Sequence, residues 1–128
     1  MATEVLVSED IAAGRNVIEA LDEVGFGVEA AFWLYKSDLD RWTLWIATPR
    51  GARDLQKAYI NVREILDTVT DRKVLDLPQI TLATPDDRTV QAVKSLIKVK
   101  GISGVRMKHN LADHDVYIED TLIYRTAA

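Results

Sequence analysis

Two aromatic runs joined by a short polar segment constrain the fold of this chain more than any other feature. The runs read VEAAFWLY over residues 28–35 and WTLWIAT over residues 42–48, and KSDLDR lies between them. Aromatic and branched residues favour strands, so the pattern predicts a β-hairpin. If Tyr35 pairs with Trp42, the two faces of the hairpin carry these residues: Trp33, Tyr35, Trp42, Leu44 and Ile46 on one, and Phe32, Leu34 and Trp45 on the other.

Both faces of this predicted hairpin are apolar, whereas a strand with one face in water alternates apolar with polar residues. The hairpin therefore lies inside the protein, or one of its faces meets a second subunit. Large exposed apolar patches mark contact sites, and two-fold dimers are the commonest closed assembly. We expect a homodimer whose interface is formed by four aromatic residues: Trp33, Tyr35, Trp42 and Trp45.

Three helices are expected around the hairpin. The first begins at Ser8, whose hydroxyl suits a helix cap, and ends at Gly25. The second spans residues 52–69, where apolar residues recur at helical spacing. The third has Thr84 as its cap and Pro85 at its first position, and Gly101 ends it. In this third helix Val90, Val93 and Ile97 face inward, and Lys98 and Lys100 lie at its last turn.

The remaining segments are predicted strands. QITLAT over residues 79–84 is a short strand, residues 73–77 are a candidate edge strand, and GVRMKHN and DVYIEDTLIYRT form a C-terminal pair around LADHD. The order is α-β-β-α-β-α-β-β. We therefore expect a single α+β domain over residues 1–128, with a mostly antiparallel sheet and about three helices.

Composition excludes several classes of protein. The chain has 128 residues and no cysteine, which excludes disulfides and cysteine-based metal sites or catalysis. We find neither a signal-peptide pattern at the start nor an apolar run long enough to span a membrane, so we expect a cytoplasmic protein. No phosphate-loop, dinucleotide or serine-triad pattern occurs. We assign no catalytic, cofactor-binding or metal-binding residue from the sequence.

Asp38 and Asp40 in the SDLD segment are the first chemical candidates. Nucleotidyltransferases carry such a pair for magnesium, but after a Gly–Ser pair and a helix, and here the preceding segment is strand-like. Aspartate and serine are also ordinary turn residues, and we favour the turn. A restriction-nuclease-like core has a similar order of elements, but its second strand needs an acid and a lysine, and WTLWIAT has neither.

A second acidic group lies near the C-terminal end of the chain. KHNLADHDVYIED holds metal-capable residues, yet their spacing fits no known motif: His109, Asp113, His114, Asp115, Glu119 and Asp120. Glu119 and Asp120 interrupt an apolar strand, and a buried charge must find a partner. We expect a bond to Arg125, to another arginine or to backbone amides. The alternative is a functional carboxylate pair in a cleft.

One basic segment stands out in a chain of net charge −4. Residues 88–112 carry six bases and no acid, and five of the bases are candidates for a basic patch: Lys94, Lys98, Lys100, Arg106 and Lys108. Clustered charge can attract nucleic acid, but the segment has no aromatic residue on which bases could stack. An acidic protein partner, or the acidic half of a second copy, suits this segment at least as well.

FWLY and RWTLWIATP, together with VYIEDTLIYR, resemble a small uncharacterised bacterial protein family with no assigned function. The resemblance implies no activity, but it implies that the two segments are neighbours in the fold. We predict a non-catalytic binding or protein-interaction module. The alternatives are a metal-dependent phosphoryl-transfer enzyme, and a nucleic-acid-binding module that uses the basic residues between 88 and 108.

Overall fold

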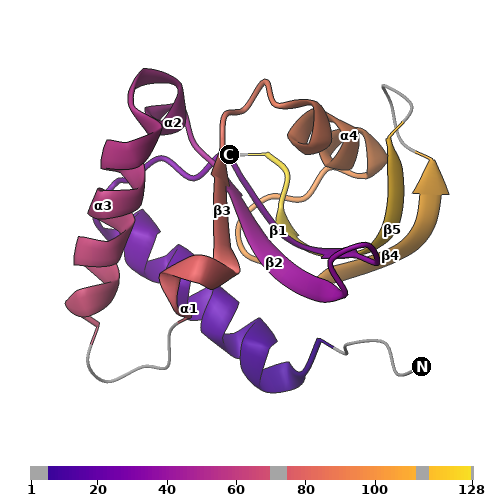
Figure 1. Ribbon diagram of the computed structural model, residues 1–128, viewed down its shortest axis with the longest axis horizontal. Helices are drawn as coiled ribbons and strands as arrows, with labels where there is room; N and C mark the ends of the chain where they lie inside the picture. Colours follow the sequence, from indigo (N-terminus) through magenta and orange to yellow (C-terminus); the bar gives the residue numbers. More distant parts are fainter. Residues whose placement is uncertain (1–5, 70–74, 112–115, 128) are drawn as a thin grey trace.

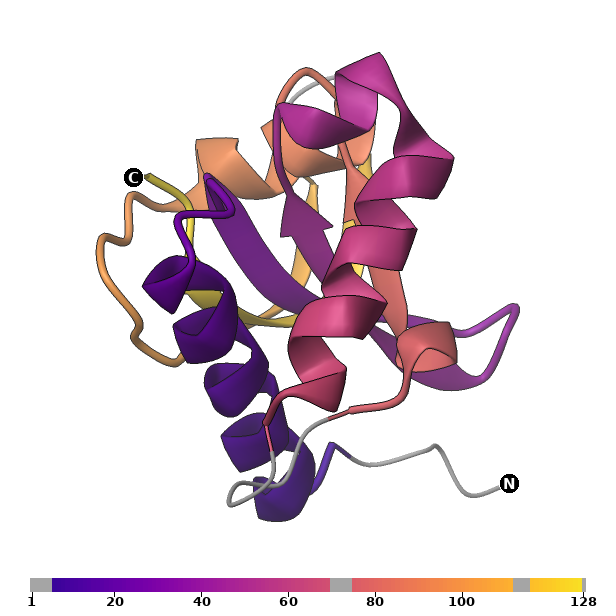
Figure 2. The ribbon, with the colours of Figure 1, turned by 90° about the vertical axis from the view of Figure 1, so that its left-hand side faces the viewer.

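A five-stranded mixed sheet with helices on both sides forms the protein. The computed structural model describes residues 6–69, 75–111 and 116–127. The strand order is β3-β2-β1-β5-β4, and only the β2–β3 pair is parallel. The expected α+β class, element order and mostly antiparallel sheet are confirmed. Figures 1 and 2 show α1 and α3 together on one side of the sheet and α4 on the other.

The elements alternate along the chain as the sequence predicted, with two short additions. α2 is a single turn before α3, and η1 is a 3-10 turn before β3. The bounds are α1 Ser8–Glu23, β1 Ala30–Lys36, β2 Arg41–Ala47, α2 Arg50–Arg53, α3 Leu55–Asp67, η1 Leu77–Gln79, β3 Ile80–Ala83, α4 Arg88–Leu96, β4 Val105–Leu111 and β5 Tyr117–Arg125.

The hairpin has the register that its apolar pattern predicted. Tyr35 pairs with Trp42, and the antiparallel ladder runs from Ala30–Ala47 to Lys36–Arg41. The face with Trp33 packs against α1 and α3, and the face with Phe32 packs against α4. Burial of a side chain such as Phe32, which is 0% exposed, contributes about 1.5–3 kcal/mol. The hairpin therefore lies inside the protein, the first of the two arrangements that its pattern allowed.

β5 lies beside β1 at the centre of the sheet. Trp33 pairs with Leu122, and Leu34 pairs with Thr121. The aromatic hairpin and the VYIEDTLIYR segment are therefore neighbours, as their joint resemblance to one family implied. α2 and α3 connect β2 to β3, and such a crossover returns the chain in the same direction, which explains the one parallel pair.

α1 packs closely on the sheet at Gly14. Trp33 Nε1 donates a hydrogen bond to Tyr124 Oη at 2.9 Å, and the Tyr124 hydroxyl donates to the Ile11 carbonyl. A Cβ at Gly14 would lie 2.6 Å from Tyr124 Oη, so any residue other than glycine would require α1 or Tyr124 to move. Burial raises the pKa of Tyr124 to about 12.

The predicted helix ends need several corrections. Val7, not Ser8, is the cap residue of α1, and no side chain caps this end. Asp87, not Thr84, caps α4, where its carboxylate accepts from the Thr89 and Val90 amides at 2.8 and 3.2 Å. The cap of α1 thus lies one residue before the predicted Ser8, and the cap of α4 lies three residues after the predicted Thr84.

α4 also ends earlier than expected, at Leu96 rather than near Gly101. Ile97 is already extended and is 36% exposed, so the prediction that it faces inward is wrong. Val99 is buried instead, and its amide donates to Thr126 Oγ1 at 2.7 Å. Thr126 thus holds the segment after α4 in an extended conformation. This hydrogen bond is lost if α4 continues for another turn, so the helix ends at Leu96.

Candidate functional site

Asp38 and Asp40 are residues of the hairpin turn. They lie between β1 and β2, and Asp40 adopts φ 48°, a left-handed conformation that aspartate tolerates better than most residues. The Tyr35 hydroxyl donates to Asp40 Oδ1 at 2.7 Å. The turn interpretation is confirmed by this geometry.

Glu119 and Asp120 bind different partners and do not converge. The Ser37 hydroxyl donates to Glu119 Oε1 at 2.9 Å. Arg106 forms a two-bond ion pair with Asp120, at 2.6 and 2.7 Å, and this bond raises the pKa of Arg106. The Arg106 guanidinium also lies 5.2 Å from the Trp42 ring centroid. Another arginine therefore anchors Asp120, one of the partners that we expected.

Arg125, the other expected partner, binds elsewhere. It is 9% exposed and donates to Asp22 at 3.0 and 2.7 Å and to the Gly101 and Val28 carbonyls. It ties the end of α1 to the start of β1 and to the segment before β4. Its role is structural.

The remaining metal-capable candidates lie outside the part of the chain that the structure describes. Asp113, His114 and Asp115 lie outside the described residues, as does the His109 side chain. Within the described part of the chain, no group of three or more His, Asp or Glu side chains is arranged to hold a metal ion. The candidate edge strand over residues 73–77 also lies partly outside it, and residues 75–77 contain no strand.

The basic segment does not form one surface. Lys94 belongs to α4, whereas Lys98 and Lys100 lie in the extended segment after it. On β4, Arg106 alternates with Met107, which packs against the α4 side of the sheet. Arg106 and Lys108 thus lie on the side of the sheet opposite to Lys94.

The four candidate interface aromatics are not an exposed patch. Trp33, Tyr35 and Trp42 are 1%, 8% and 7% exposed. Trp45 is half-buried, and its ring stacks on Phe32 with the centroids 6.0 Å apart. The expectation that aromatic surface remains uncovered is wrong for Trp33, Tyr35 and Trp42, because α1 and α3 together cover the face that carries them.

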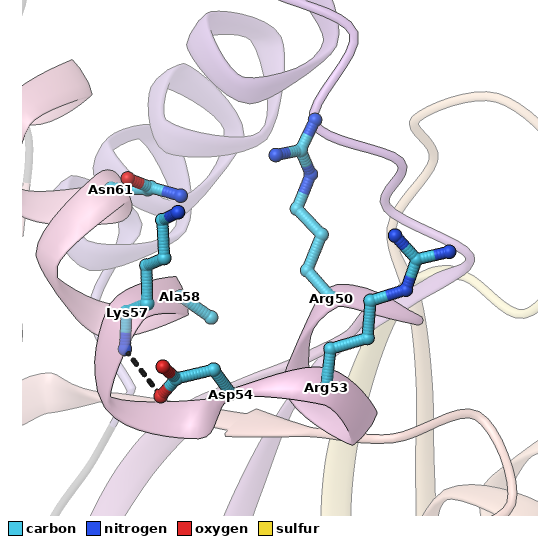
Figure 3. Close-up of a pocket in the computed structure, with 6 residues that line it drawn as sticks. All are labelled: Arg50, Arg53, Asp54, Lys57, Ala58 and Asn61. Atoms are coloured by element: carbon cyan, nitrogen blue, oxygen red, sulfur yellow. Dashed lines mark hydrogen bonds between the residues drawn. The ribbon is translucent and has the colours of Figure 1, made fainter.

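A basic pocket that the sequence analysis missed lies at the junction of α2 and α3. It has a volume of about 340 Å³. Figure 3 shows Lys57 and Asn61 on one side of it, Asp54 below them, and Arg50 on the other side, with the Arg53 guanidinium directed away from Lys57. Its lining comprises three cations, one carboxylate, one amide and one methyl group: Arg50, Arg53, Lys57, Asp54, Asn61 and Ala58.

Local structure fixes the positions of Asp54 and Ala58 in the pocket. Asp54 has an extended backbone, φ −159°, which separates α2 from α3, and its Oδ1 accepts from the Lys57 amide at 3.1 Å. This bond caps α3, so the carboxylate already serves the helix end. Ala58 is buried against the sheet, and its small side chain leaves space between the longer residues on either side.

Arg50 is the most restrained cation of the pocket. Its Nε donates to the Phe26 carbonyl at 2.8 Å, and its guanidinium lies 5.0 Å from the Phe26 ring centroid. Arg53 and Lys57 are exposed, and their side chains have no ion-pair or hydrogen-bond partner among the residues that the structure describes. The pocket thus carries more positive than negative charge.

The sequence contained only a partial signal for this pocket. Arg50, Arg53 and Lys57 are three cations within eight residues, but Asp54 interrupts the helix between Arg53 and Lys57, so helical spacing alone does not bring them together. The proline and glycine of TPRGARD are typical of a loop, so the sequence did not predict the helical turn of α2.

Comparisons with known proteins give no relative. No family model, no curated protein and no solved structure matches the chain. The resemblance to a small bacterial family stays a prediction. In the described residues, no helix is both long enough and apolar enough to cross a membrane.

Proposed function

We propose that the protein is a non-catalytic binding module that holds an anionic group in the pocket between α2 and α3. The observation that carries this proposal is the grouping of Arg50, Arg53 and Lys57 around one opening of about 340 Å³. A guanidinium group can donate two parallel hydrogen bonds to a pair of oxygens of a phosphate or a carboxylate. Asp54 offsets only part of their charge and is bonded to the Lys57 amide.

The restraint on Arg50 supports a binding role for this cluster. A cation held by the Phe26 carbonyl and ring has lost conformational freedom before any ligand arrives. Less entropy is then lost on binding, which raises affinity. Lys57 stands across the pocket from Arg50, so that both can donate to one anion, and Arg53 points away from Lys57 and adds positive charge nearby (Figure 3).

Thermal unfolding with inorganic phosphate tests the proposal. We expect a dissociation constant on the order of 1 mM, typical of a small ion at an open site. About 10 mM phosphate would then stabilise the protein by roughly 1.4 kcal/mol and raise Tm by about 4–6 °C. Sodium chloride at equal ionic strength controls for general screening, which should give no comparable rise.

A matched pair of variants gives this experiment its specificity. R53Q/K57Q removes two pocket cations, whereas K94Q/K98Q removes two cations from the basic segment with the same change in net charge. We expect the first variant to lose the phosphate effect and the second to keep it. An equal response of both variants, or none in the native protein, would contradict the proposal.

We propose a homodimer in the cytoplasm, as the sequence analysis does, with an interface that does not include Trp33, Tyr35 and Trp42, because these side chains are buried under α1 and α3. An acidic protein partner for the basic segment over residues 88–112 also stays a prediction. Sedimentation equilibrium tests the dimer, and a single species near 14.4 kDa at tens of micromolar would refute it.

Phosphoryl transfer and nucleic-acid binding are less well supported as functions. The carboxylates nominated for metal chemistry are turn residues or are bonded to Ser37 and Arg106. The basic residues nominated for nucleic acid lie on opposite sides of the sheet. Neither arrangement gathers the groups that its function needs.

A further inference from the structure

The pocket between α2 and α3 is not lined by cations alone, and this mixture bears on its ligand. Asp54 and Asn61 lie beside Lys57 in its lining (Figure 3). A ligand that is anionic all round would bring negative charge against Asp54. A ligand that pairs one anionic group with hydrogen-bond donors would use the whole lining.

Asp54 and Asn61 have the hydrogen-bonding capacity for such donors. The bond from the Lys57 amide uses one lone-pair site of the Asp54 carboxylate, which can accept about four hydrogen bonds. The Asn61 amide offers both an acceptor and donors. Hydroxyl groups suit these two side chains, because a hydroxyl both donates and accepts.

The rest of the lining limits the class of ligand further. None of the described lining residues is aromatic, so the pocket offers no surface on which a nucleobase could stack. A volume of about 340 Å³ is at the lower end for small-molecule sites, which favours a compact ligand over a polymer. Three cations at one opening favour phosphate, which carries more charge than a carboxylate.

We propose that the ligand is a small phosphorylated polyol of the sugar-phosphate class. Its phosphate lies among Arg50, Arg53 and Lys57, and its hydroxyl groups bind Asp54 and Asn61. This inference rests on the proposed function, since it assigns the ligand of the same anion site.

Titrations with three probes separate this inference from the proposed function. The probes are inorganic phosphate, ribose 5-phosphate and ribose, each at the same pH and ionic strength. Two further hydrogen bonds, one of them to a carboxylate, should make ribose 5-phosphate bind about 10-fold or more tightly than phosphate. Ribose alone should bind far more weakly than ribose 5-phosphate, because it lacks the charged group.

Two variants test the assigned roles. Asp54→Asn keeps a good helix cap but removes the negative charge, so phosphate should bind more tightly and the preference for ribose 5-phosphate should shrink. Asn61→Leu should weaken ribose 5-phosphate by about 3–10-fold and leave phosphate nearly unchanged. Far-ultraviolet circular dichroism of both variants checks that they remain folded.

Each outcome has a defined consequence. If the native protein binds ribose 5-phosphate more tightly than phosphate, and if the ratio of the two affinities decreases in both variants, the inference is supported. Equal affinity for phosphate and ribose 5-phosphate, or ribose binding as tightly as ribose 5-phosphate, would overturn it and leave anion binding to be judged from phosphate alone. If neither phosphate nor ribose 5-phosphate bound, the inference and the proposed function would both fail.

Discussion

Replacing Gly14 by alanine tests the close packing of α1 on the sheet. In an exposed helix this change would stabilise the protein by about 1 kcal/mol, because alanine is the better helix former. Here the new Cβ would lie 2.6 Å from Tyr124 Oη and 3.0 Å from Trp33 Nε1. The helix must move away, or Tyr124 must give up its hydrogen bonds to Trp33 and Ile11.

The expected magnitude follows from these opposing contributions. Overpacking costs about 1–3 kcal/mol, and a buried donor left without its acceptor costs a similar amount. After the gain in helix propensity is subtracted from these costs, we expect G14A to lower the free energy of unfolding by roughly 2 kcal/mol. Urea unfolding followed by tryptophan fluorescence measures this as a lower midpoint with an unchanged slope.

Two comparisons isolate the cause of the loss. Ala12→Gly, at an exposed position of the same helix, should cost only about 0.5–1 kcal/mol and calibrates helix propensity. Tyr124→Phe removes the oxygen that the new methyl group meets, so G14A should cost less in that background than in the native protein. A G14A protein as stable as the native one would refute the packing argument.

Three further predictions concern the carboxylates and Tyr124. Asp38→Asn with Asp40→Asn should leave the fold and any magnesium response unchanged, and a magnesium-dependent rise in Tm that this variant loses would contradict the turn assignment. Asp120→Ala should cost on the order of 1 kcal/mol in urea unfolding, because the ion pair to Arg106 is partly exposed, and no loss would mean that the pair contributes nothing. The pKa of Tyr124 is raised to about 12 in the folded protein, so its contribution to stability is complete below the ordinary pKa of about 10 and is lost as pH rises through 12. Between pH 9 and 12 the free energy of unfolding should therefore decrease more steeply with pH for the native protein than for Tyr124→Phe. An equal dependence on pH in the two proteins would show that this hydroxyl titrates normally.

Sequence patterns predicted the sheet better than they predicted the helix ends. The register at Tyr35 and Trp42 followed from side-chain alternation, which a strand imposes on every residue. The end of α4 did not follow, because Val99 is drawn into an extended segment by Thr126, 27 residues later in the chain. No local pattern around Lys98 or Gly101 contains that contact.

The candidate sites show the same division between local and distant contacts. The turn role of Asp38 and Asp40 depends on their near neighbours and was predicted correctly. The sequence left three kinds of partner open for Asp120, namely Arg125, another arginine or backbone amides, and the choice of Arg106 depends on how β4 lies beside β5. The pocket was missed because Arg50 owes its position to Phe26, 24 residues earlier, and spacing along the chain does not reveal that bond.

The most direct test of anion binding at the pocket is a two-dimensional amide NMR titration with inorganic phosphate. It reports on each backbone amide and needs only weak binding. We predict shifts that saturate and that centre on residues 50–61, with a smaller change at Phe26, whose carbonyl binds Arg50. Shifts confined to residues 94–108, or no saturable shift anywhere, would contradict the proposed pocket.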